Sequence, residues 1–346
     1  MDSPARLRPT RPEDFSEMAL AQKASQLGEV FEGRVPSARE LENITEELGV
    51  ELATAIVLKI LQDSPVHGEF GRRMRAIDPA DPLDRSSLTN EIEVTVVASN
   101  HFRSGRKWGD HVDTWRAWAR DIGFKTDVIE TLPGSSVAEN ARLIREMLTG
   151  GHRTRRIIVT YGQGASEFRY LLHRLRALNG MHELNDVRGW LNICGSFNGS
   201  SASRYYDQNV FRRSLEKIRL RLSGRNPSTV SETSSSFLMW RYPTGIPREL
   251  ITVSLVGLPM RWQISRGLYF LYDQISRRQP NDGVVSFLEA TAQPGVIVPI
   301  SGMSHHAAEM KLRPVFQRTL LLMANSLEIE AKKSPTSEPP GLELDL

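Results

Sequence analysis

The segment of this 346-residue chain with the clearest chemical potential is a glycine-rich turn, Val159–Ser166. Its sequence, Val-Thr-Tyr-Gly-Gln-Gly-Ala-Ser, follows a β-branched run and precedes a helical pattern, which predicts a strand, a sharp turn and a helix. A strained turn built from small residues can present a nucleophile at the edge of a sheet. The amides at a helix N-terminus can instead hold a phosphate, although this segment lacks the Lys-Ser/Thr of a P-loop and a complete Gly-x-Gly-x-x-Gly pattern.

Other polar residues could contribute to a site, and each also has a simpler role. Asp282 lies in Asn-Asp-Gly, which is a common tight-turn sequence. The pair His305–His306 could be a surface feature or half of a metal site, but no further ligand stands at suitable spacing, so we expect no metal and no cofactor. Ser166 lies four residues after Gly162, where it would cap or pack the start of the helix. Cys194 lies in an apolar strand pattern and is most simply a core residue.

Taken together, these segments resemble the α/β-hydrolase superfamily, in its lipase- and esterase-like branch. The turn resembles the nucleophile elbow Gly-x-Ser-x-Gly, with Thr160 at the first glycine, Gly162 at the serine and Gly164 at the last glycine. Further segments follow in the order of the family. Before the turn lies Val96–Phe102, which is similar to a strand and loop ending in His-Gly-Phe, and then Ser136–Ala141, which is similar to a Ser-x-x-x-Asn-Ala helix start. After the turn, Ile193–Ser200 is similar to the strand end Gly-[ST]-Pro-x-x-Gly-[ST]. Asn281–Val285 is similar to the acid segment, and Gly302–His305 is similar to the Gly-x-x-His segment. The resemblance covers about residues 91–325.

The resemblance implies a role for each of these polar residues. Asp282 would orient His305, and His305 would be the general base. His306 is the alternative base if the turn is shifted by one residue. Backbone N–H groups of Gln163 and of the His101–Phe102 region would form the oxyanion hole, which requires no particular side chain.

The nucleophile position is occupied by Gly162, which has no side chain to attack a carbonyl. The first hypothesis is therefore a catalytically silent or impaired pseudoenzyme, a binding or regulatory module for a small-molecule or acyl ligand. The second is an active carboxylic-ester hydrolase in which His305 and Asp282 activate a water molecule, or in which Ser166 replaces the missing serine. The third is a nucleotide or phosphate binder that uses Tyr161–Ala165.

Alternating strand and helix patterns must position these residues. Strands are predicted at Ile92–Ala98, Lys125–Ile129, Arg156–Thr160, Trp190–Cys194, Leu250–Leu255 and Val296–Ile300, and helices at Trp115–Ile122, Val137–Leu148 and Ser166–Leu178. This alternation predicts the α/β class, a mainly parallel sheet with helices on both faces. With the resemblance, we expect an α/β-hydrolase-like domain over residues 91–330. Residues 200–248, which contain the basic helix-like run Arg212–Leu222, are expected to form a cap or lid insertion.

The ends of the chain differ from this pattern. Residues 1–14 predict a flexible arm and residues 15–90 an N-terminal helical region. Within that region Ser37 can cap a helix, and Val50–Leu61 is apolar around much of its circumference, so it must be buried. These helices could cover the sheet edge or recruit a protein partner. Residues 331–346 predict a disordered tail.

Composition and charge exclude several classes of protein. The net charge of +3, from 44 Lys and Arg against 41 Asp and Glu, gives no support for nucleic-acid binding. The 40% hydrophobic fraction is typical of a packed globule.

The single cysteine cannot form an internal disulfide, which favours a reducing compartment. The absence of an apolar signal region and of any apolar run near the roughly 20 residues of a spanning helix predicts a soluble, cytoplasmic protein with no transmembrane segment. Arginines of a basic run, among them Arg155 and Arg156, are expected on a solvated face.

Overall fold

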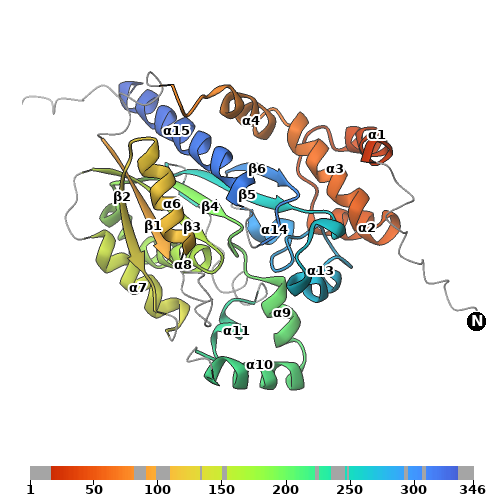
Figure 1. Cartoon of the computed structure of the whole chain (residues 1–346). Helices are drawn as coiled ribbons and strands as arrows, with labels where there is room; N and C mark the ends of the chain where they lie inside the picture. Colours follow the sequence, from red (N-terminus) through yellow and green to blue (C-terminus); the bar gives the residue numbers. More distant parts are fainter. Residues whose placement is uncertain are drawn as a thin grey trace, which may run out of the picture.

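Six parallel strands form a sheet at the centre of the computed structural model of this chain (Figure 1). Their order across the sheet is β2-β1-β3-β4-β5-β6. The strands are β1 (Ile92–Ala98), β2 (Lys125–Glu130), β3 (Arg155–Tyr161), β4 (Val187–Ile193), β5 (Ile251–Leu258) and β6 (Val296–Ser301). The structure describes residues 17–81, 91–98, 110–132, 135–149, 154–222, 226–234, 246–247, 249–291, 295–305 and 309–333.

Helices cover both faces of this sheet. On one face lie α6 (Asp110–Asp121) and α15 (Glu309–Lys333), and on the other lie α7 (Val137–Leu148) and α8 (Gly164–Ala177) (Figure 1). Strand β3 shows the division, because Ile157 and Val159 pack on the α6 and α15 side whereas Ile158 packs under α7 and α8. A strand buried on both faces needs apolar residues at successive positions, which explains the β-branched run. The predicted α/β class is confirmed.

The strand order changes direction at the carboxyl ends of β1 and β3. From β1 the chain crosses to β2 on one side, and it then returns to β3 on the other side of β1. In parallel sheets, ligand sites form outside the carboxyl ends of strands at such a switch in chain direction. Because β3 ends at Tyr161, the turn at Gly162 lies at this switch in chain direction.

The N-terminal helices cover the β6 edge of the sheet. They are α1 (Glu17–Gly28), α2 (Ala38–Leu48), α3 (Val50–Asp63) and α4 (His67–Ala76). Ser37 caps α2, as its sequence predicts, and it also forms a capping box with Glu40. Val57 of α3 shares a core with Ile297 of β6. His67 Nδ1 accepts the N–H of Ile297 at 3.2 Å, and burial lowers the pKa of His67, which keeps this nitrogen an acceptor. An amide of the edge strand is therefore paired.

The segment between β4 and β5 extends from the edge at which the strands end (Figure 1). It contains α9 (Ser201–Asp207), α10 (Val210–Leu222) and α11 (Thr229–Glu232). Its start is tied to the segment that follows Asp282, because the N–H of Ala202 and the hydroxyl of Ser200 both donate to the carbonyl of Val284. Two further helices, α13 (Tyr269–Ile275) and α14 (Phe287–Ala290), lie between β5 and β6. A cap at residues 200–248 stays a prediction.

The predicted surroundings are confirmed for Cys194 and wrong for Arg156. Cys194 is buried among the apolar side chains of the core, as its sequence predicts, although it lies one residue beyond β4 and has a positive φ of 43°. Arg156 is 2% exposed and not solvated. Its guanidinium lies 3.2 Å from Asp186 and 3.5 Å from Glu93, so two carboxylates compensate the buried charge.

The predicted chain ends are only partly covered by the described residues. Residues 1–16 and 334–346, which contain the predicted arm and most of the predicted tail, lie outside them. The helix α15 continues to Lys333, past the expected start of the tail at residue 331. In the described part of the chain, every helix is too short or too polar to traverse a bilayer.

Candidate active site

The turn after β3 is held in place by the loop after β4. Gly162, at the apex of this turn, has a φ of +53°, in the left-handed region that favours glycine. Its carbonyl accepts hydrogen bonds from the N–H of Ser196 at 2.8 Å and from the Ser196 hydroxyl at 3.1 Å. Helix α8 begins two residues later, at Gly164. The change from strand to helix is therefore abrupt, and Gly162 lies at the carboxyl edge of the sheet.

Asp282 and His305 are in contact, although 23 residues separate them in the chain. Oδ2 of Asp282 lies 2.8 Å from Nδ1 of His305, and the N–H of His305 donates to the carbonyl of Asp282 at 2.8 Å. Oδ1 of Asp282 accepts the N–H groups of Val284 and Val285 at 2.9 and 2.8 Å. Both side chains are 2% exposed. Because a carboxylate oxygen can only accept hydrogen bonds, Nδ1 of His305 is the donor in this contact, and Nε2 is the nitrogen left to accept a proton.

His305 faces Gly162. A Cβ added at Gly162 would lie 4.0 Å from Nε2 of His305, and no other heavy atom of the described residues, apart from the chain neighbours, comes within that distance. A hydroxyl one bond beyond this Cβ could come within hydrogen-bond reach of Nε2. Gly162, His305 and Asp282 thus have the relative placement of a nucleophile, a base and an orienting acid, with no side chain at the first position.

Tyr161 and Cys194 also contact this pair, although the sequence did not indicate either as its neighbour. The hydroxyl of Tyr161 donates to the carbonyl of His305 at 2.6 Å, and its ring stacks on the imidazole with centroids 5.4 Å apart. The thiol of Cys194 lies beside the carboxylate of Asp282. Burial, with a smaller effect from the charge of Asp282, raises the pKa of both Tyr161 and Cys194, so both stay protonated. A tyrosine before a turn and a cysteine in an apolar run carry no sequence signal for this role.

Ser166 is buried in the interior, where its hydroxyl is engaged. It donates to the carbonyl of Ser196 and lies 3.0 Å from the Ser196 hydroxyl. Ser196 in turn holds the carbonyl of Gly162, so Ser166 supports the turn indirectly. This geometry favours the packing role that the sequence suggested and disfavours Ser166 as an alternative nucleophile.

Gln163 connects the turn to a buried carboxylate. Among the described residues its backbone N–H has no acceptor, which leaves it available to a ligand oxygen. Its side-chain Nε2 donates to Glu167 at 3.1 Å, and Nδ2 of Asn140 donates to the same oxygen at 2.8 Å. Burial raises the pKa of Glu167 to about 7 despite these two donors. Asn140, part of the Ser-x-x-x-Asn-Ala motif, also bonds the N–H and the carbonyl of Leu132, so it links α7, α8 and the loop after β2.

Some predicted site residues cannot be placed. His101–Phe102 and His306 lie outside the described residues, so the second half of the oxyanion hole and the alternative base stay predictions. Within the described ranges, no three His, Cys, Asp or Glu side chains are grouped so that they could hold a metal ion.

Close packing behind the site predicts that Gly257→Ala destabilises the fold. A Cβ at Gly257 would lie 2.3 Å from the carbonyl oxygen of Met303 and 3.5 Å from Cβ of Asp282. The added methyl must displace the loop that carries His305, so the free energy of unfolding should fall by about 2 kcal/mol. Gly267→Ala is the matched control, since no heavy atom of the described chain lies within 4 Å of its added Cβ. Urea denaturation measures the effect, and equal midpoints for the two variants would contradict this packing.

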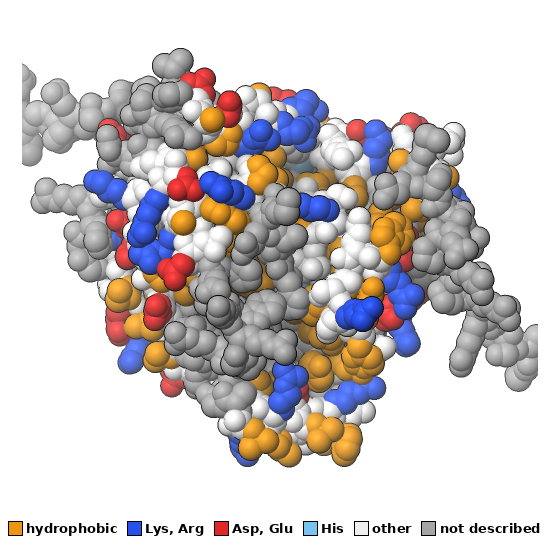
Figure 2. Space-filling view, viewed as in Figure 1, with side chains coloured by type: hydrophobic (Ala, Val, Ile, Leu, Met, Phe, Trp, Pro, Cys, Tyr) orange, Lys and Arg blue, Asp and Glu red, His pale blue; other side chains and the backbone are white. Residues whose placement is uncertain are grey.

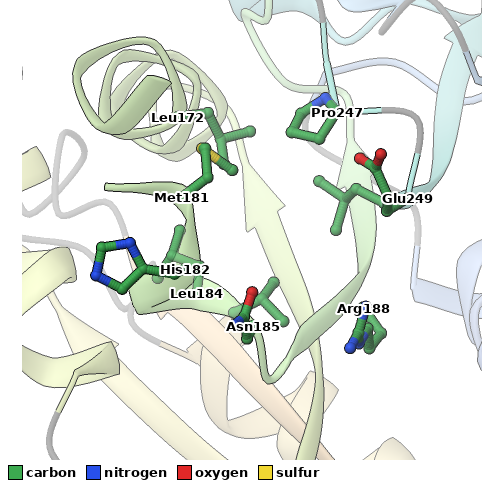
Figure 3. A pocket seen from close by; sticks show the side chains of 10 residues that line it. Leu172, Met181, His182, Leu184, Asn185, Arg188, Pro247 and Glu249 are labelled. Atoms are coloured by element: carbon green, nitrogen blue, oxygen red, sulfur yellow. The ribbon is translucent and has the colours of Figure 1, made fainter. Parts of the chain in front are cut away.

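A separate cavity of about 330 Å³ lies at the opposite edge of the sheet (Figure 3). Its lining includes Val187, the first residue of β4, and Leu250, which directly precedes β5. Leu172 and Met181 lie close together on one side, and Pro247 lies on the other (Figure 3). The amino ends of the strands border this cavity, so it is distinct from the site at Gly162.

Comparisons with known proteins bear on the fold. No family model matches the sequence, and no curated protein matches it. Among solved structures, the metagenomic carboxyl esterase MGS0156 is similar over 70% of this chain and 76% of its own, with 16% sequence identity and a TM-score of 0.53. The Bacillus licheniformis lipase BlEst2 in its mature form is similar over 72% of this chain and 93% of its own, with 14% identity and a TM-score of 0.49. The first likeness and the parallel sheet show that the chain has the α/β-hydrolase fold that its sequence predicts.

Proposed function

We propose that this chain is a pseudoenzyme of the lipase- and esterase-like kind, which binds a small-molecule or acyl ligand beside Gly162 without cleaving it by serine chemistry. One observation carries the proposal. The position facing the basic nitrogen of His305 belongs to a residue with no side chain, while His305 itself is held by Asp282 at 2.8 Å. The base is therefore oriented, and the atom that it would activate is missing.

The surroundings of Gly162 support ligand binding. The turn lies at the carboxyl ends of the strands, where the strand order changes direction and where ligands of parallel sheets bind. The N–H of Gln163, at the start of α8, can donate to a carbonyl oxygen of a bound ester. The absence of a hydroxymethyl group at residue 162 adds room for a ligand or a water molecule next to His305.

A second candidate function is slow ester hydrolysis by a water molecule that His305 activates. The observation that favours it is that the acid and the base are both in place. Asp282 accepts two backbone amides and contacts His305, and the His305 imidazole is buried. Serine hydrolases that lack a triad member retain roughly 10³- to 10⁴-fold catalysis over water, so measurable turnover is physically possible.

The hydrolysis of short- and long-chain p-nitrophenyl esters separates these functions. We expect the unaltered chain to hydrolyse these esters no faster than the variant His305→Ala does. The matched control is His173→Ala, which replaces a histidine on α8. The same esters should raise the unfolding temperature in a concentration-dependent manner, because they bind the folded state. Turnover that His305→Ala abolishes and His173→Ala preserves would instead establish the water-dependent hydrolase. An unchanged unfolding temperature would count against a ligand site for these esters.

A further inference from the structure

Helix α10 presents a row of apolar side chains to solvent. The apolar stripe consists of Phe211, Leu215, Ile218 and Leu222, which are 73%, 52%, 53% and 85% exposed. Their spacing of four, three and four residues places them within an arc of about 60° on the helix. The buried residue Leu220 lies on the opposite side, so the stripe points away from the body of the protein. In Figure 2, hydrophobic side chains gather at the lower edge of the molecule, over α10.

Cationic side chains flank the apolar stripe on both sides. By helical position, Arg212 and Arg219 lie along one border, and Lys217 and Arg221 lie along the other. The helix has one acidic residue, Glu216, whose side chain is only 14% exposed and lies near the buried side. A helix with an apolar face between rows of Lys and Arg has the pattern of helices that lie in a membrane interface.

We propose that α10 docks this protein on the surface of an anionic lipid bilayer. The convex stripe enters the boundary between headgroups and acyl chains, and the flanking cations contact the lipid phosphates. Charge complementarity selects this occupant. A planar anionic surface meets the stripe and both cationic borders at once, whereas a second copy of α10 would bring cations against cations.

An exposed aromatic residue near α10 enlarges the proposed docking surface. The guanidinium of Arg212 lies over the ring of Tyr205, 4.2 Å from its centroid, and this ring contacts Phe270 of α13 edge to face at 5.6 Å. Phe270 is 58% exposed. Apart from Phe270, the docking surface lies on the segment that follows the carboxyl end of β4, so a docked protein would hold this edge of the sheet toward the lipid. The proposal does not depend on catalysis at the Asp282–His305 pair.

Flotation of the full chain with lipid vesicles tests the proposal. We expect binding to phosphatidylcholine vesicles that contain about 30% phosphatidylglycerol, and much weaker binding to pure phosphatidylcholine or at high salt. Leu215→Gln with Ile218→Gln removes apolar area without adding charge, and should weaken partitioning at least about tenfold. Lys217→Gln with Arg221→Gln should weaken binding to the anionic vesicles alone, at least about fivefold.

Matched controls distinguish the apolar stripe from other surfaces. Val30→Gln with Leu178→Gln changes two residues of similar exposure elsewhere on the chain and should bind as the unaltered protein does. Circular dichroism and the unfolding temperature establish that each variant folds. The proposal fails if the folded protein does not float with anionic vesicles, or if Leu215→Gln with Ile218→Gln binds unchanged. It also fails if light scattering shows a dimer that these two substitutions dissociate, because a second copy would then cover the stripe.

Discussion

Gly162→Ser should raise the hydrolysis of p-nitrophenyl esters by about 10³-fold or more over the unaltered chain. The Cβ of the new serine would lie 4.0 Å from Nε2 of His305, which brings its hydroxyl within hydrogen-bond reach. His305, oriented by Asp282, can then take the hydroxyl proton while the oxygen attacks the ester carbonyl. Removing the nucleophile from a working serine hydrolase costs about 10⁶-fold in kcat, so even partial recovery in this site is a large effect.

Gly162→Ala is the matched control for this gain of activity. The φ of +53° at residue 162 strains any side chain, at a cost of about 1–2 kcal/mol. Serine and alanine should therefore lower the free energy of unfolding by similar amounts, while only serine supplies a hydroxyl. Adding His305→Ala to Gly162→Ser should remove the activity again. Equal rates for folded Gly162→Ser and Gly162→Ala would show that His305 does not activate a group at this position.

Raising the pH should destabilise the protein through Glu167. Burial raises the pKa of this carboxyl from 4.5 to about 7, so the folded state favours its protonated form. Its contribution to the free energy of unfolding is complete below about pH 4.5, falls as the pH rises toward 7, and then stays low. The difference in pKa between the two states corresponds to about 3 kcal/mol across this range.

The variant Glu167→Gln isolates this contribution from other titrating groups. The amide cannot ionise, and its oxygen can still accept from Asn140 and Gln163. We expect Glu167→Gln to match the unaltered chain at pH 5 and to exceed it by up to about 3 kcal/mol at pH 8 in urea denaturation. The control is Glu47→Gln, an exposed position on α2, which should follow the unaltered protein at both pH values. A constant difference between Glu167→Gln and the unaltered chain would contradict a pKa near 7.

The central strands could be predicted because their burial dictates their composition. The core of β3, Ile157–Val159, is buried on both faces, and only apolar residues satisfy both sides. A local signal also succeeded where it describes a self-contained structure, as in the helix cap at Ser37. The fold class followed from these elements, since strands that alternate with helices have few arrangements.

Within the candidate site, the family resemblance pointed to residues in recognisable short segments and missed residues that have only a spatial role. Asp282 and His305 stand in recognisable short segments, and they do lie together. Tyr161 and Cys194 touch this pair through contacts that depend on the folded positions of β3 and β4, which no local pattern encodes. The predicted solvated position of Arg156 was wrong for a similar reason, because its two carboxylate partners come from distant segments of the chain.

The most direct test of the central claim is covalent labelling with an alkyl fluorophosphonate, which modifies a serine only where a neighbouring base activates it. Intact-mass measurement and peptide mapping locate the adduct without any assumption about the natural ligand. We predict no adduct on the unaltered chain, one adduct at residue 162 of Gly162→Ser, and none when His305→Ala is added. An adduct on the unaltered chain that depends on His305, or none on folded Gly162→Ser, would contradict a hydrolase site that lacks only its nucleophile.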